Sequence, residues 1–243
     1  MGKPPKQPRA KGSMKPASSS RAAEVASGGA NALSFQNLGG FAQFSGTTTI
    51  GSPVATGSSD ADMVSMNNLD AELVMILKKI SKRDAITKLK ALEELETYLK
   101  ANTNVIPAVI PAWSKMYVKL TIEVDRRVRL VTNNVHLLVS ANAKKKLAPH
   151  LKEFIGPWLI TMFDQSPDVA RAARNSFNTV FSEDKRVGVL EFCQKDILEY
   201  VTEMILSKTP DTLSDPRHVT KEDMAAKFAR VISGCFNCIC HII

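Results

Sequence analysis

Hydrophobic residues recur at steps of three and four along most of the chain after Leu69, which is the spacing of helices that bury one face. The pattern is clearest in residues 81–99, where most charged side chains take the face opposite the apolar one. The apolar positions of this stretch are Ala85, Leu89, Leu92, Leu95 and Leu99. A helix of this kind can bury only one stripe, so it requires neighbouring helices.

The same reasoning predicts a nearly continuous series of helices. They are expected over residues 70–80, 84 to about 101, about 107 or 111 to 120, about 126–140, 147–162, 167–180, about 186–207, and from 220 onward. Asp125 and Ser166 are placed to cap the amino ends of two of them, and Thr220 with Asp223 forms a possible capping box. Pro149 and Pro157 are expected to bend or divide the segment that contains them, and residues 209–219 are expected to form a loop.

A repeat of about forty residues underlies this series. Asp84 and Lys88 are echoed 41 residues later by Asp125 and Arg129, and the basic position recurs 42 residues further on at Arg171. Helical repeats of the HEAT and armadillo kind have a period of roughly 40–47 residues. The sequence therefore predicts an all-α, HEAT/armadillo-like α-solenoid of antiparallel helix pairs over residues 69–243. These five residues are its candidate hydrogen-bonded ladder between repeats.

Residues 1–68 differ in composition, being rich in Gly, Ser, Ala, Thr and Pro with little apolar periodicity, and they predict a disordered basic tail. A mitochondrial transit peptide is the alternative for its first residues, but four prolines interrupt the amphipathic helix that such a signal needs. Within the tail, Phe41 and Phe44 are candidates for docking into a groove of this chain or of a partner. Chance remains the competing explanation for this aromatic pair.

The chain has a formal net charge of +8 and a pI near 9.3, which permits an acidic partner such as RNA without requiring one. Its basic residues form three clusters. They are Lys78, Lys79, Lys82 and Arg83; then Arg126, Arg127 and Arg129; and then Lys144, Lys145 and Lys146. The first two clusters fall at equivalent repeat turns, so stacking would bring them to one edge that could contact the phosphates of ribosomal RNA. Lys144 and Lys145 of the third cluster are further candidates for contact with the ribosome. A solvated surface is the alternative, and Arg129 is also a ladder residue.

The four cysteines are too few and too clustered to form a disulfide framework, which favours a reducing compartment. Cys235, Cys238, Cys240 and His241 offer soft ligands, but a helical pattern surrounds them and no second ligand pair lies near, so buried apolar cysteines are favoured over a metal site. His136 lies on or beside an apolar face and is interpreted as structural. No pair of nucleophile and base is evident, and no apolar run reaches the length of a membrane span.

Several stretches in order along the chain resemble the N-terminal region of listerin, a family of RING-type E3 ubiquitin ligases. They are residues 11–24, 39–41, 77–92, 125–129 and 145–151. The resemblance implies a cytosolic, ribosome-associated protein of ribosome quality control, whose family ubiquitinates nascent chains stalled on large ribosomal subunits. It also implies two partners for this region, namely the large subunit and a cofactor that binds peptidyl-tRNA.

The sequence lacks the eight Cys or His ligands with which a RING holds two zinc ions. We therefore expect no cofactor and no ubiquitin transfer in this chain alone, with zinc and the ubiquitin-conjugating enzyme bound only through a RING that it lacks. The alternative function is a generic HEAT-repeat adaptor that binds a protein partner and has no role at the ribosome. An enzyme would have to depend on the cysteine cluster.

Overall fold

The structure is a computed structural model, and it describes residue 2 and residues 69–242. The predicted tail, with Phe41 and Phe44, lies outside the described residues. The helices are α3 (Ala71–Ile80), α4 (Ala85–Ala101), α5 (Ile106–Leu120), α6 (Arg126–Ala143), α7 (Leu151–Thr161), α8 (Pro167–Val180), α9 (Glu183–Phe192), α10 (Gln194–Ser207), α11 (Pro210–Leu213) and α12 (Lys221–Ile242). Two 3-10 segments, η2 (Thr103–Val105) and η3 (Lys144–His150), precede α5 and α7.

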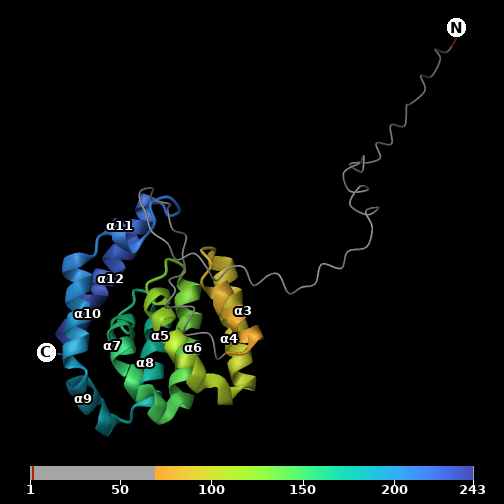
Figure 1. The fold of residues 1–243 in the computed structure, drawn as a ribbon. Helices are drawn as coiled ribbons and strands as arrows, with labels where there is room; N and C mark the ends of the chain where they lie inside the picture. The colour runs from red at the N-terminus through yellow and green to blue at the C-terminus, as the bar shows by residue number, and fades with distance from the viewer. Residues whose placement is uncertain (1, 3–68, 243) are drawn as a thin grey trace, which may run out of the picture. The chain divides into compact units, whose positions relative to one another are not determined.

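The helices form an all-α solenoid, which confirms the predicted fold class. α3 packs against α4, α5 against α6 and α7 against α8, while α6 also packs between α4 and α8, so that these three helices form one layer. α5 and α7 form the second layer, and α10 and α12 pack against α7 at the end of the array. Figure 1 shows α3 and α4 at one side, α10 to α12 at the other, and the remaining pairs between them. No strand occurs within residues 69–242.

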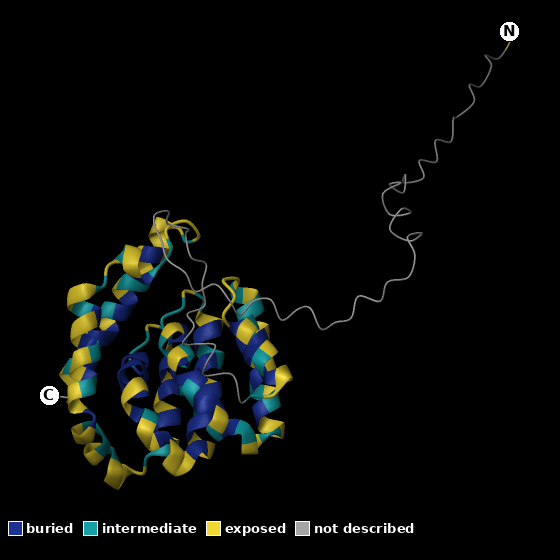
Figure 2. Ribbon diagram, viewed as in Figure 1, coloured by how far each residue is buried: buried dark blue, intermediate teal, exposed yellow. Residues whose placement is uncertain are grey.

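α7 is the central helix of the domain. It contacts α5, α8, α10 and α12, and every residue from Phe154 to Thr161 is buried. Neighbouring helices approach it closely, because a Cβ atom at Gly156 would lie 2.7 Å from the Tyr200 ring, and one at Gly234 would lie 2.9 Å from the Ile160 side chain. Figure 2 shows this buried centre, with the exposed residues on the outer faces of the helices. The glycines therefore set how closely α10 and α12 pack on α7.

The core between α5, α6 and α7 is built from aromatic rings around a buried histidine. The His136 ring stacks on Tyr117 with ring centroids 3.9 Å apart, and it meets the Trp158 ring edge to face at 4.2 Å. Trp113 Nε1 donates to His136 Nδ1 at 3.2 Å, so His136 Nε2 carries the proton and faces Ser140 Oγ at 3.3 Å. Burial lowers the pKa of His136 to about 3. The histidine is therefore a neutral, hydrogen-bonded part of the core.

Two predictions of helix boundaries are wrong. The single helix expected over residues 186–207 is divided at Cys193 into α9 and α10. α9 has no buried residue, whereas α10 packs Ile197, Val201 and Met204 inward, so the two helices follow different packing directions without a Pro or Gly between them. The expected loop over residues 209–219 contains the short helix α11, which Thr209 caps by accepting from the Thr212 N–H.

Candidate nucleic-acid interface

The helices of one layer begin at equivalent turns. The N-cap residues of α4, α6 and α8 are Asp84, Asp125 and Ser166, and successive N-caps are 41 residues apart. Asp84 accepts from Thr87 N at 2.7 Å and from Thr87 Oγ1 at 2.6 Å, and Asp125 accepts from Arg127 N at 2.8 Å. The side-chain hydrogen bonds from Thr87 and Arg127 are the main cause of a lowered pKa at each carboxyl. We call the three turns, residues 81–84, 121–125 and 162–166, the turn edge.

The third turn is built differently. The Ser166 hydroxyl forms no capping hydrogen bond, so the predicted hydroxyl cap is wrong, although α8 begins at Pro167 as expected. Asp164 instead accepts from Ser166 N at 2.8 Å. The carboxylate two residues earlier thus orders this turn and leaves the hydroxyl near the Arg129 guanidinium, at 3.4 Å.

Ionic bonds join successive turns. Lys88 of the first repeat pairs with Glu123 of the second. Arg129 of the second repeat donates from Nε to Asp164 Oδ2 at 2.8 Å and from Nη2 to Asp164 Oδ1 at 3.1 Å. Both pairs span 35 residues. A ladder between repeats therefore exists, and its basic members are the predicted Lys88 and Arg129.

The acidic members of the ladder differ from those predicted. Asp84 and Asp125 cap their own helices, and Glu123 and Asp164 are the carboxylates that pair with a basic residue of the preceding repeat. Arg171, the third predicted basic member, is exposed and forms no ion pair among the described residues. The recurring 35-residue interval from base to acid was visible in the sequence, but the acids that precede the helix caps were not recognised.

Arg230 of α12 is a further member that sequence reasoning missed. Its Nη1 lies 3.3 Å from Asp164 Oδ2, and its Nη2 donates to the carbonyl oxygens of Ile122 and Glu123 at 3.1 and 2.9 Å. Burial lowers its pKa to about 10. One buried carboxylate, Asp164, therefore holds two arginines from different helices, and the last helix is fixed to the second and third turns.

The outer surface of the turn edge carries exposed cations, most of which face a partner. Arg126 Nη1 lies 3.1 Å from Asp168 Oδ2, and Arg127 Nη2 lies 2.8 Å from Asp125 Oδ2. Arg83 contacts His218 of the loop after α11. The remaining members of the first cluster are Lys78 and Lys82, which are exposed and form no ion pair with another described residue, and Lys79, which pairs with Glu94. The first two predicted clusters thus lie along one edge.

The third cluster lies elsewhere. Lys144, Lys145 and Lys146 follow the carboxyl end of α6, at the opposite end of that helix from Arg126. All three are exposed, and none forms a hydrogen bond or ion pair within residues 69–242. Lys144 has φ of 51°, the only positive value at a non-glycine residue of the described chain. We call this group the lysine end; it does not extend the turn edge.

Two thiols of the cysteine cluster are buried in the core. Cys235 and Cys238 are buried, and burial raises the pKa of both thiols to about 12, so neither is a reactive thiolate. No group of three His, Cys, Asp or Glu side chains in the described part of the chain could hold a metal ion. None of the described helices combines the length and apolar character needed to cross a membrane.

The fold and the turn edge define a helical-repeat domain with a basic, ion-paired surface and a buried interrepeat ladder. The chain belongs to the listerin family. A family model described as E3 ubiquitin-protein ligase listerin, N-terminal domain, matches residues 67–243.

Comparison with individual proteins agrees with the family model. The chain is 38% identical over 228 residues to the E3 ubiquitin-protein ligase listerin of Gallus gallus, an alignment that covers 93% of this chain. It is 35% identical to the proteins of the same name from Mus musculus and Drosophila melanogaster, over 93% and 95% of this chain. These alignments cover only 12–13% of the length of the relatives.

Proposed function

We propose that this domain docks a listerin-type E3 ubiquitin ligase on the large ribosomal subunit, with the turn edge contacting the phosphates of ribosomal RNA. In this proposal the complete ligase acts in the cytosol on nascent chains stalled on large subunits, and its RING transfers the ubiquitin. A cofactor that binds peptidyl-tRNA is the expected neighbour. Membership in the family supports the proposal, and the alignment of two basic clusters along one edge is the structural observation that carries it.

Phosphate groups can compete for the arginines of this edge. The side chains of Arg126 and Arg127 are each 60% exposed, so their ion pairs with Asp168 and Asp125 are solvated. Exposed ion pairs are typically worth only about 0.2–1 kcal/mol. A phosphate that displaces a carboxylate also releases condensed counterions, which favours binding at low salt. The surface is suited to binding RNA through its backbone, without reading bases.

The test is co-sedimentation of the 243-residue chain with purified large ribosomal subunits over a salt series. A variant with Lys82, Arg83, Arg126 and Arg127 changed to Glu should lose binding. Single Ala variants should lower the slope of log affinity against log salt by about 0.7–0.9 for each phosphate contact removed. Circular dichroism would establish that helicity is retained.

The matched control changes four other exposed lysines, Lys90, Lys100, Lys185 and Lys195, to Glu. This variant has the same net charge, and it also loses one solvated ion pair, because Lys100 pairs with Glu96. It should bind nearly as well as the unchanged chain. Equal loss in both variants would mean that only net charge matters. Binding that survives in the turn-edge variant would overturn the proposed contact, and the absence of binding at any salt concentration would favour an adaptor without a ribosomal role.

A further inference from the structure

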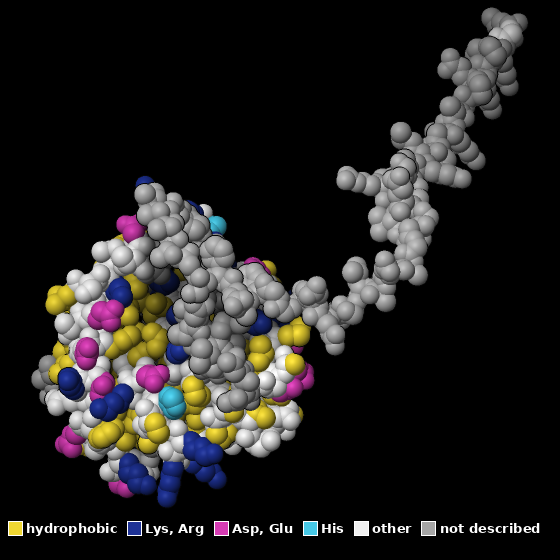
Figure 3. Space-filling view, in the orientation of Figure 1, with side chains coloured by type: hydrophobic (Ala, Val, Ile, Leu, Met, Phe, Trp, Pro, Cys, Tyr) yellow, Lys and Arg dark blue, Asp and Glu magenta, His cyan; other side chains and the backbone are white. Residues whose placement is uncertain are grey.

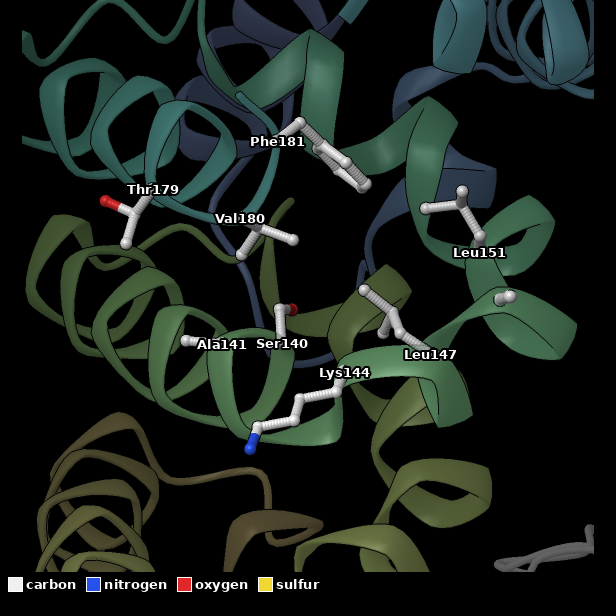
Figure 4. A pocket seen from close by; sticks show the side chains of 9 residues that line it. Ser140, Ala141, Lys144, Leu147, Leu151, Thr179, Val180 and Phe181 are labelled. Atoms are coloured by element: carbon white, nitrogen blue, oxygen red, sulfur yellow. The ribbon is translucent and has the colours of Figure 1, made fainter. Parts of the chain in front are cut away.

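A cavity of about 300 Å³ opens at the lysine end of the domain. Its walls come from the last turns of α6 and α8, from η3 and from the start of α7. The lining residues are Ser140, Ala141, Lys144, Leu147, Ala148, Leu151, Thr179, Val180 and Phe181. Figure 4 shows Leu147, Leu151, Val180 and Phe181 pointing toward one another across the cavity. Its interior is therefore predominantly apolar.

The rim of the cavity is positively charged. Lys144 lines it, with its side chain running away from the four apolar residues (Figure 4), and Lys145 and Lys146 follow in the chain. No Asp or Glu lines the cavity, and none occurs between residues 126 and 152 or between residues 169 and 182, the stretches that build its walls. The acids that follow directly, Glu153 and Glu183, lie outside the lining. Figure 3 shows a group of Lys and Arg side chains at the lower edge of the visible face, where Figure 1 draws the green part of the chain.

The backbone at this rim is held in an unusual conformation. Lys144 has φ 51° and ψ −128°, which L-residues rarely adopt. The turn brings the chain sharply from α6 into η3, so that Leu147 is buried beside the cavity while the three lysines stay exposed. Conformations of this kind tend to persist at binding sites, where the surrounding structure fixes them. The backbone strain therefore lies at a lysine that lines the mouth of the cavity.

We propose that this cavity binds a short acidic segment of a partner protein, which inserts one large aliphatic or aromatic side chain and places flanking Asp or Glu carboxylates on the lysines. The apolar walls provide burial for the inserted side chain. Lys144 at the cavity and the exposed Lys145 and Lys146 beside it in the chain, none of which pairs with a carboxylate of residues 69–242, provide the charge complementarity. The cavity volume, at the lower end of the range for ligand pockets, suits one or two side chains. This site is independent of the turn edge, since it lies at the other end of α6.

The probe is the fluorescein-labelled peptide Asp-Glu-Phe-Glu-Asp with an amidated carboxyl end, and fluorescence anisotropy measures its binding to the 243-residue chain. Replacing its Phe by Ala should weaken binding at least tenfold. Replacing its four acids by Lys should abolish binding.

Variants of the protein distinguish the contribution of the apolar cavity to peptide binding from that of the lysine charges. Ala141→Phe places a ring at the cavity wall and should weaken binding at least tenfold. Asn142→Phe is the matched control, because Asn142 is exposed on the same helical turn but does not line the cavity, and it should bind normally. Changing Lys144, Lys145 and Lys146 to Glu should abolish binding, whereas changing Lys90, Lys185 and Lys195 to Glu should not.

Three results would overturn the proposal. They are no binding of the acidic peptide to the unchanged chain, binding that ignores the Phe to Ala change in the peptide, and binding that survives Ala141→Phe. If an oligouridylate binds to the unchanged chain and Ala141→Phe abolishes that binding, the cavity would be assigned to RNA instead. Because turn-edge variants leave this site intact, loss of ribosome binding and loss of peptide binding are distinguishable. Circular dichroism of each variant excludes unfolding as the cause.

Discussion

The turn edge and the lysine end are both basic, but their charges are held in different ways. At the turn edge, arginines face the carboxylates of Asp125, Asp164 and Asp168, and the innermost pair is buried. At the lysine end, Lys144, Lys145 and Lys146 form no ion pair with any carboxylate in the described part of the chain. The two ends of α6 thus show that a cluster of basic residues can be part of the architecture or a surface available to a partner.

The difference follows from position in the repeat. The turn edge is where successive repeats meet, so a buried carboxylate there can satisfy donors from two or three elements at once. The lysine end follows the carboxyl end of a helix, where cations are favoured by the helix dipole without an acidic partner. Arginine, which has a planar fork of donors, is the basic residue at the amino end of α6, and lysine is the basic residue at its carboxyl end.

Removing the shared carboxylate should have the largest effect. Asp164→Ala removes the carboxylate that the buried Arg129 and Arg230 share, and breaking a buried ion pair typically costs about 3–5 kcal/mol. Urea unfolding would measure this as a lower free energy of unfolding. Asp168→Ala, which removes the partner of the exposed Arg126, should cost less than about 1 kcal/mol. Similar losses in the two variants would mean that burial does not distinguish the inner and outer pairs.

Acid should destabilise the domain through His136, which lies on α6 between the two ends. Its pKa is lowered from 6.5 to about 3 in the folded state, so only the unfolded chain takes up a proton between these values. The stabilising effect is therefore complete above about pH 6.5 and should decline by about 2–3 kcal/mol by about pH 4.5. Unfolding free energies over this range would test it. His136→Gln should show a shallower pH dependence, whatever its stability at neutral pH, and an unchanged slope would assign the effect to other groups.

Relieving the backbone strain at the lysine end should have a smaller effect of opposite sign. A non-glycine residue held at such a φ costs about 1–3 kcal/mol, and glycine loses about 0.5–1 kcal/mol more than other residues through chain entropy. Lys144→Gly should therefore raise the free energy of unfolding by about 1 kcal/mol. Lys145→Gly is the control, because Lys145 has no positive φ, and it should be slightly destabilising. A loss of stability in the first variant would mean that the Lys144 side chain contributes more than its backbone costs.

Much of the fold was predictable because hydrophobic period and helix caps are local signals. The helix predicted from Arg126 extends to Ala143, three residues beyond the predicted end at Ser140, and α3, α4 and α8 begin within one residue of prediction. Thr220 also caps α12 as expected, accepting from Asp223 N at 3.1 Å. The break at Cys193 was missed because it depends on which neighbours the two flanking helices pack against, and no breaking residue marks it.

The candidate interface was predictable only in part. Equivalent turns could be aligned by the 41-residue repeat, which placed Arg83 and Arg126 along one edge. The partner choices within that edge could not be read, because Arg230 reaches Glu123 from 107 residues away, a contact that only the tertiary structure defines. The cavity at the lysine end was missed for the same reason, since its walls combine residues 140–151 with residues 179–181.

The contacts of Arg230 also bear on truncation of the domain. A fragment without α12 keeps the pair of Arg129 with Asp164, because both residues lie within the first three helix pairs. It lacks the donors that Arg230 gives to Asp164 and to the carbonyl groups of Ile122 and Glu123, of which only the Glu123 carbonyl also accepts from Arg129. Fragments that lack α12 are therefore expected to be less stable than the domain that contains it.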